Sequence, residues 1–144
     1  MSDTLLHAEP FGRLLLAPEV PCVIIAWDGF ANSTQFRFLM DRGLELYRAE
    51  AARTQPLGWL ADTRDVRAVK PIDQEWMQND WNTRAFAAGI HHVSFVVPET
   101  VFGQISVQSY TSNVADANAN AYDIATSQHH TLEKAKAWLK TAIH

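Results

Sequence analysis

The sequence predicts an α/β protein built on one mixed, mostly parallel central sheet of about five strands with about four helices. Short β-branched runs alternate with longer segments whose apolar residues recur at helical spacing. Only the first two strand candidates follow each other without a helix between them, so the expected order is ββαβαβαβα. The 144 residues contain no internal repeat or low-complexity linker, which favours a single domain over residues 1–144.

The first two strands are expected at 11–16 and 20–27. The first, FGRLLL, is short and is followed by Pro18 and Pro21, which favours an edge strand and a turn. The second, VPCVIIAW, shows little alternation, as is typical of a strand covered on both faces. Its residue Cys22 is expected to be a buried, unreactive thiol.

A helix and a third strand follow. Ser33 is a suitable N-cap for an amphipathic helix from about Thr34 to Ala52, because its hydroxyl can accept hydrogen bonds from the first turn. The segment GWLAD, residues 58–62, then predicts a central strand. A polar cluster, residues 62–65, is expected at the carboxyl end of this strand.

The segment from Pro71 to Gly89 predicts one helix with firm boundaries. Pro71 suits the first helical position, where the missing N–H has no helical partner. Asp73 and Glu75 fall in the first turn, where the helix dipole favours carboxylates. Gly89 supplies the left-handed residue that commonly ends a helix.

This helix is expected to have two apolar faces. At about 100° per residue, one side carries Met77, Trp81, Ala85 and Ala88. The roughly opposite side carries Ile72, Trp76, Phe86 and Ala87. One face can meet the core, and the other requires cover from the same chain, a second subunit or an apolar ligand. Ile72, Trp76 and Phe86 are therefore the candidate partner- or ligand-binding residues.

The last third of the chain predicts two strands and two helices. A strand is expected at 92–97 and a helix at 101–118, followed by a weak terminal strand at 122–126. Thr131 is then expected to cap the last helix. The apolar stripe of this helix consists of Leu132, Ala135, Trp138, Leu139 and Ala142.

Composition narrows the classes of partner. The formal net charge of −4 provides no basic patch for phosphates, so nucleic acid is a poor candidate. No signal peptide is visible, and no run approaches the roughly 18 apolar residues that span a bilayer. Cys22 is the only cysteine, so no intrachain disulfide forms. A cytoplasmic protein without a membrane span is expected.

Polar residues at strand ends offer a second candidate site. Ligands of open α/β sheets favour the carboxyl ends of strands, where Asp28, Asp62, Arg64 and Asp65 are expected to gather. Adjacent carboxylates such as Asp62 and Asp65 could act as an acid/base pair. Surface turns and ion pairs are the commoner role of such residues, so catalysis is the less favoured interpretation.

No cofactor or metal site is expected. The adjacent pairs 91–92 and 129–130 are histidines, but successive side chains on an extended segment point to opposite faces and chelate poorly. The sequence contains no zinc motif, phosphate loop or nucleophile elbow. We therefore expect no metal, no cofactor and no catalytic residue.

The order of elements and a set of short motifs resemble the bacterial SpoIIAA-like, or STAS-like, proteins. These motifs are WDGF, WLAD, QEWMQNDWNTRAFAAG, SFVVP and LEKAKAWL, and the resemblance runs from about Val23 to Leu139. It implies an α/β fold and a regulatory role through protein binding. Some STAS domains switch partners when a serine after the third strand is phosphorylated. The matching segment here, VKPID, has no serine or threonine, so this switch is not carried over.

Three functional hypotheses follow. The leading one is a non-catalytic STAS-like domain that binds a protein partner or itself as a homodimer. The second is a small carrier whose helix lines a pocket for an apolar or lipid-like molecule. The third is an enzyme that uses the cluster around Asp62, Arg64 and Asp65.

Overall fold

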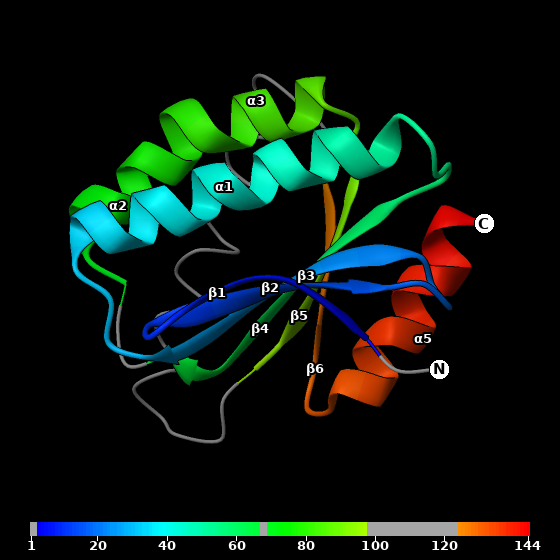
Figure 1. The fold of residues 1–144 in the computed structure, drawn as a ribbon, viewed down its shortest axis with the longest axis horizontal. Helices are drawn as coiled ribbons and strands as arrows, with labels where there is room; N and C mark the ends of the chain where they lie inside the picture. The colour runs from blue at the N-terminus through cyan, green and yellow to red at the C-terminus, as the bar shows by residue number, and fades with distance from the viewer. Residues whose placement is uncertain (1–2, 67–68, 98–123) are drawn as a thin grey trace.

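A computed structural model describes residues 3–66, 69–97 and 124–144. One six-stranded sheet, in the order β1-β2-β3-β4-β5-β6, lies between two helical layers (Figure 1). Strands β1 to β3 are antiparallel, and β3 to β6 are parallel. The predicted α/β class and mostly parallel sheet are therefore confirmed. The strands are β1 (Thr4–Glu9), β2 (Gly12–Ala17), β3 (Cys22–Gly29), β4 (Gly58–Val66), β5 (His92–Val96) and β6 (Ala125–His129).

The described residues form three helices, where about four were expected for the whole chain. The first is α1 (Ser33–Ala51), and the last is α5 (Leu132–Ile143). Between them runs one continuous helix made of α2 (Pro71–Trp76), the π-helical turn η1 (Met77–Trp81) and α3 (Asn82–Ala87). The helix predicted at 101–118 lies outside the described residues.

Strand β1 is the element that the sequence analysis missed. It pairs with β2 through a tight turn, with Glu9 opposite Gly12 and Thr4 opposite Leu16. The prediction that residues 11–16 form the edge strand was therefore wrong, because β1 occupies the edge. Most side chains of β1 are exposed or half-buried, and such a strand leaves little hydrophobic alternation in the sequence.

Two local predictions also need correction. The N-cap of α1 is Asn32, not Ser33: its side chain accepts from the backbone N–H of Gln35, whose side chain accepts from the N–H of Asn32. Strand β4 continues through the polar cluster to Val66 instead of ending at Asp62. This extension pairs with the end of β3, where Asp28 lies opposite Asp65.

The helix between Pro71 and Ala87 has the predicted boundaries. Pro71 occupies its first turn, and Gly89 has a φ of 107°. The N–H of Ile90 reaches back to the carbonyl of Ala85, which closes the helix in a Schellman-type cap. The π-helical turn in its middle was not predicted.

The C-terminal elements differ from the sequence analysis mainly in the bounds of β6. This strand covers Ala125–His129 instead of 122–126 and is the sheet edge opposite β1, and β5 ends at Val96 instead of Val97. The side chain of Thr131 accepts from the N–H of Lys134, which confirms the predicted cap of α5. Residues 122 and 123 lie outside the described part of the chain.

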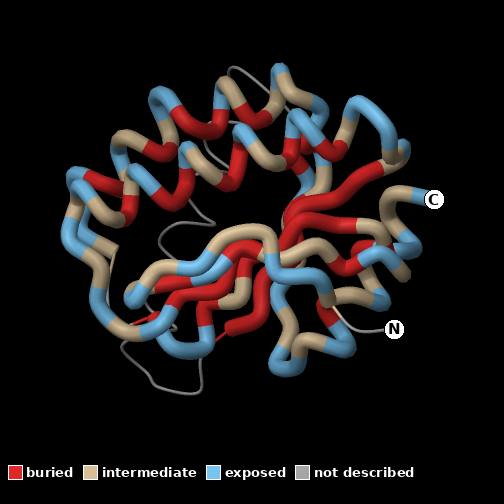
Figure 2. The backbone as a smooth tube through the Cα atoms, viewed as in Figure 1, coloured by how far each residue is buried: buried red, intermediate tan, exposed pale blue. Residues whose placement is uncertain are grey.

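The core has two parts, one on each face of the sheet (Figure 2). The larger part lies between the sheet and the layer of α1 and α2-η1-α3, and the smaller part lies under α5. Gly43 lets α1 approach the sheet closely, since a Cβ atom there would come within 2.7 Å of the Trp59 ring. Cys22 is buried under α5, and burial raises the pKa of its thiol, as expected of an unreactive cysteine.

Candidate functional site

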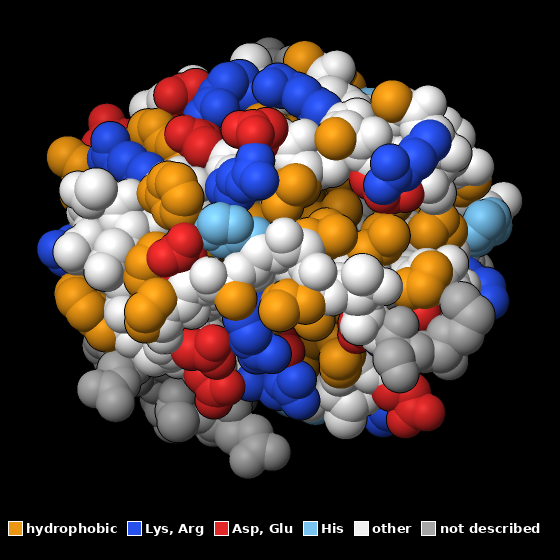
Figure 3. All heavy atoms as spheres, viewed as in Figure 1, with side chains coloured by type: hydrophobic (Ala, Val, Ile, Leu, Met, Phe, Trp, Pro, Cys, Tyr) orange, Lys and Arg blue, Asp and Glu red, His pale blue; other side chains and the backbone are white. Residues whose placement is uncertain are grey.

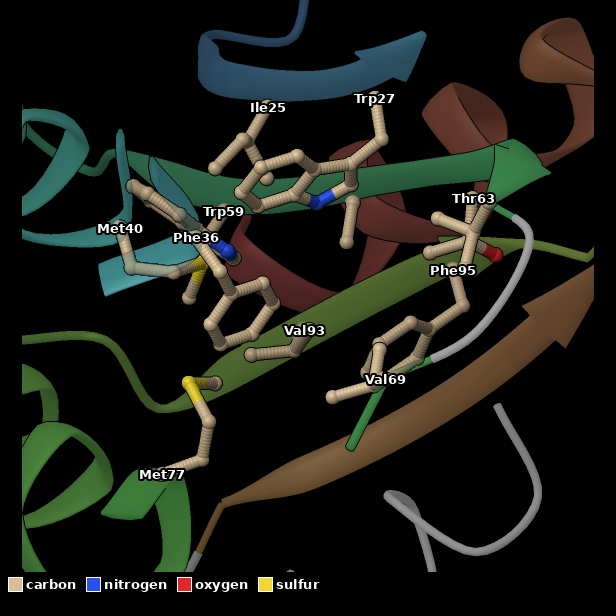
Figure 4. Close-up of a pocket in the computed structure, with 12 residues that line it drawn as sticks. Ile25, Trp27, Phe36, Met40, Trp59, Thr63, Val69, Met77, Val93 and Phe95 are labelled. Carbon is tan, nitrogen blue, oxygen red and sulfur yellow. The ribbon is translucent and has the colours of Figure 1, made fainter. Parts of the chain in front are cut away.

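An apolar cavity lies inside the larger core, between the sheet and helices α1 and η1 (Figure 4). We refer to it as the ligand cavity, and its volume is about 50 Å³. Side chains of both layers point toward one another across it. Its lining consists of Ile25, Trp27, Phe36, Met40, Trp59, Ala61, Thr63, Val66, Val69, Met77, Val93 and Phe95.

Strand alternation accounts for the floor of the cavity. Successive side chains of a strand point to opposite faces, so every second residue of β3, β4 and β5 points toward α1. In the middle of this floor stands Ala61, a small residue between the large ring of Trp59 and the half-polar side chain of Thr63. A methyl group at this position leaves space that a larger side chain would fill.

Helices α1 and η1 form the roof of the cavity. Phe36 and Met40 lie one helical turn apart on the buried face of α1, and Met77 begins the π-helical turn. Phe36 stacks on Trp27 with the ring centroids 5.1 Å apart and an interplanar angle of 15°. Methionine side chains are flexible, so this roof can adjust to different shapes.

The lining offers few polar groups. The hydroxyl of Thr63 donates a hydrogen bond to the backbone carbonyl of Val96, with 2.6 Å between the oxygens. Its hydrogen is therefore already used within the sheet. Among the described residues, no ionisable side chain lines the cavity. The described lining is therefore suited to contact with an apolar molecule.

A smaller hollow adjoins the cavity at the carboxyl ends of β3 and β4. It shares Trp27, Phe36, Val66 and Val69 with the ligand cavity and adds Gly29 and Ala31. The neighbouring residue Phe30 is 56% exposed, and the ammonium of Lys70 lies 6.0 Å from its ring centroid. The shared residues connect the interior of the cavity with this end of the sheet.

The structure separates the three predicted binding residues. Ile72 is 61% exposed on α2. Trp76 is half-buried against its own chain, with the guanidinium carbons of Arg37 and Arg84 lying 5.2 and 5.8 Å from its ring centroid. Phe36 contacts the same indole edge-on, at 6.4 Å between centroids. The chain itself therefore supplies much of the cover for Trp76.

Phe86 lies at a different place on the helix layer. Its ring is 4.7 Å from that of His91, and it lines an open hollow of about 240 Å³ with His91, His92 and Ala125. Trp76 thus faces α1, whereas Phe86 faces the start of β5 and β6. The extra residue of the π-helical turn rotates the two halves of the helix relative to each other, which explains this separation.

Three of the four polar candidates form ion pairs away from the ligand cavity. Asp62 and Arg64 are paired through two contacts, Nε to Oδ1 at 2.9 Å and Nη2 to Oδ2 at 2.6 Å. This hydrogen bonding to Asp62 raises the pKa of the Arg64 guanidinium. Asp28 contacts Arg13 at 3.3 Å, and Asp65 is exposed. None of these residues lines the ligand cavity, because Asp62 and Arg64 alternate with Thr63 along β4.

The histidines do not form a metal site in the described part of the chain. No group of three or more histidine, cysteine, aspartate or glutamate side chains is placed there to hold an ion. His92 and His129 both lie beside Trp138 of α5. Burial, together with the charges of His130 and Lys134, lowers the pKa of His129.

The face of the molecule seen in Figure 3 mixes charges of both signs. Basic and acidic side chains are interspersed over the helix layer and the lower strands in Figure 3, with hydrophobic atoms between them. Among the described residues, no helix combines the length and the apolar character needed to cross a bilayer.

Comparison with protein-family models, curated proteins and solved structures finds no match to this chain. The site therefore rests on geometry alone. The sequence analysis predicted most of its lining residues in strands and helices, but it left Thr63, Val66 and Val69 outside any predicted element. The signal that could have indicated a cavity is Ala61, a small residue that follows the large Trp59 on the same face of the strand.

Proposed function

We propose that this chain is a non-catalytic domain that binds a small apolar molecule in the ligand cavity. The observation that supports this most directly is an apolar space inside the larger core, lined by both helix and sheet. Apolar pockets with few polar groups are typical of sites for small ligands. This proposal favours the carrier hypothesis over an enzyme, because the paired Asp62 and Arg64 point away from the cavity.

The volume limits the size of the ligand. A cavity of about 150 Å³ in another protein binds benzene, whereas this one has about 50 Å³. A molecule built on one ring therefore requires the roof to move. Met40 and Met77 can provide such movement, since their unbranched side chains have several rotatable bonds. We infer a ligand of about one ring and not a long acyl chain.

The SpoIIAA-like assignment remains part of the proposal. It is supported by the motifs in the sequence and by the alternation of strands and helices after an initial antiparallel unit. Protein binding or self-association is the second candidate function. The exposure of Ile72 favours it, but Trp76 and Phe86 do not extend that surface into one patch.

Filling the cavity tests the proposed function. Ala61→Leu places a larger side chain in its floor, and Ala137→Leu adds the same atoms at an exposed position of α5 as a control. Binding of toluene would be measured by the chemical-shift changes of backbone amides in NMR titrations. We expect the wild type and Ala137→Leu to bind alike and Ala61→Leu to bind at least roughly tenfold more weakly.

Two results would count against this function. One is a wild-type spectrum that toluene leaves unchanged up to its solubility limit. The other is an equal response of wild type and Ala61→Leu, which would locate the binding elsewhere. Thermal unfolding of each variant should accompany the titration, because overpacking alone can destabilise a core.

A further inference from the structure

Two tryptophans provide hydrogen-bond donors in the otherwise apolar lining of the ligand cavity. Trp27 and Trp59 both line the cavity and are only 6% and 2% exposed. An indole N–H can donate a hydrogen bond but cannot accept one. Within the described part of the chain, neither indole donates to a protein acceptor. Trp81 differs, since its N–H donates to the backbone carbonyl of Met40 at 2.9 Å.

Neither the Trp27 nor the Trp59 indole nitrogen is among the fully buried polar atoms without a partner, so each N–H keeps some accessible surface at which an acceptor can meet it. Tryptophan N–H groups in protein interiors usually find a hydrogen-bond partner. Trp27 belongs to β3 and Trp59 to the adjacent strand β4. Both indoles therefore lie on the floor of the same cavity, with their rings visible in Figure 4.

We propose that the natural ligand is an apolar molecule with one oxygen acceptor, such as a ketone or ester carbonyl, that accepts a hydrogen bond from the indole of Trp27 or Trp59. The inference deepens the proposed function and depends on it. An acceptor would satisfy a donor that the described part of the chain leaves unpaired, while the apolar part of the ligand fills the remaining space. The cavity would then prefer a carbonyl compound to a hydrocarbon of equal shape.

A matched pair of probes isolates this acceptor. Acetophenone and α-methylstyrene have nearly the same shape, but only acetophenone has an oxygen in place of the terminal CH2 group. Each would be titrated into uniformly ¹⁵N-labelled protein, and the five tryptophan indole N–H signals would be followed. The indole of Trp81 serves as an internal control, because its hydrogen bond to Met40 is already formed.

Three single variants assign the signals and measure the contribution of each donor. Trp27→Phe and Trp59→Phe each remove one indole N–H and keep an aromatic ring. Trp138→Phe makes the same change on α5, away from the cavity. The quantity compared is the ratio of the two dissociation constants, so a general loss of packing affects both probes and cancels.

We expect acetophenone to shift the indole proton signal of Trp27 or Trp59 downfield and α-methylstyrene to leave it nearly unchanged. The variant that removes the bonding donor should lower the preference for acetophenone by roughly fivefold, while Trp138→Phe keeps it.

Other outcomes overturn the inference in distinguishable ways. One such outcome is that both probes bind with the same indole shifts, and that the ratio of their dissociation constants is the same in every variant. The ligand then fills the cavity without a hydrogen bond from an indole, which contradicts the inference and leaves the proposed function standing. If acetophenone binds but shifts neither indole, a bound water or another group meets its oxygen, and the inference is again wrong. If neither probe binds, the proposed function and the inference fall together.

Discussion

Asp73 lies where two helices begin, and its carboxylate connects them. Its side chain is 3% exposed and accepts from the hydroxyl of Ser33 at 2.9 Å and from Nε of Arg37 at 3.1 Å. Ser33 is the first residue of α1, and Asp73 lies in the first turn of α2. A carboxylate at this place also interacts favourably with the dipoles of both helices. The sequence analysis placed Asp73 in the first turn but could not place Ser33 beside it.

Replacing Asp73 tests this connection at the scale of one residue. We expect Asp73→Ala to lower the free energy of unfolding by about 1–3 kcal/mol, because it leaves the Ser33 hydroxyl and the Arg37 guanidinium without their acceptor. The half-exposed Arg37 can turn to water, which keeps the loss below that of a fully buried pair. Urea denaturation monitored by circular dichroism gives the value.

Asp80→Ala is the matched control on the same helix. Asp80 is 53% exposed and pairs with Arg84, so its removal should cost less than about 0.5 kcal/mol. Equal losses in the two variants would show that the contact with Ser33 and Arg37 contributes no more than a surface ion pair.

At the scale of elements, the π-helical turn follows from the spacing of the buried residues. Asp73, Met77, Trp81 and Ala85 are all buried and recur every four residues. In an α-helix, residues four apart are offset by about 40° around the helix axis. Over the three intervals between these four buried residues the offset would reach about 120°. One additional residue in the η1 turn compensates for most of this offset. The spacing was visible in the sequence, but an ideal helix was assumed, which also grouped Trp76 with Phe86.

Removing one residue tests this explanation. Deletion of Asn79, an exposed residue inside η1, changes the spacings of the buried residues to four, three and four, which suit a regular α-helix. We therefore expect a folded protein whose free energy of unfolding changes by less than about 1 kcal/mol. Chemical denaturation and the indole NMR signal of Trp81 provide the measurements.

Deletion of Glu45, an exposed residue of α1, is the comparison. Helix α1 is a regular α-helix without a π-helical turn, so the deletion rotates Tyr47 away from Leu57. The Tyr47 hydroxyl normally donates a hydrogen bond to the carbonyl oxygen of Leu57 at 2.7 Å. This variant should lose several kcal/mol or fail to fold. If the Asn79 deletion is equally damaging, the π-helical turn is required by the fold and does not merely correct the spacing.

At the scale of the whole molecule, the sequence predicts the sheet and the helix layers better than the ligand cavity between them. β-Branched runs such as VPCVIIAW identify central strands because burial on both faces leaves a continuous apolar pattern. The exposed strand β1 lacks such a pattern and was missed. The cavity was missed for another reason: its lining has the same residue types as a filled core. Its volume depends on how side chains from five elements meet, which no single segment encodes.

Trp81 and Trp76 lie on different sides of the continuous helix α2-η1-α3. Trp81 is 1% exposed, lies 5.2 Å from the Trp59 ring and donates to Met40, so it joins the helix layer to the sheet. Trp81→Asp would bury an unpaired carboxylate in this layer, and we expect it to prevent folding. Trp76→Asp instead places a carboxylate between Arg37 and Arg84, where it can form ion pairs at a cost of about 1–3 kcal/mol. Far-ultraviolet circular dichroism and urea denaturation distinguish the two variants, and a folded Trp81→Asp protein would contradict this arrangement of layers.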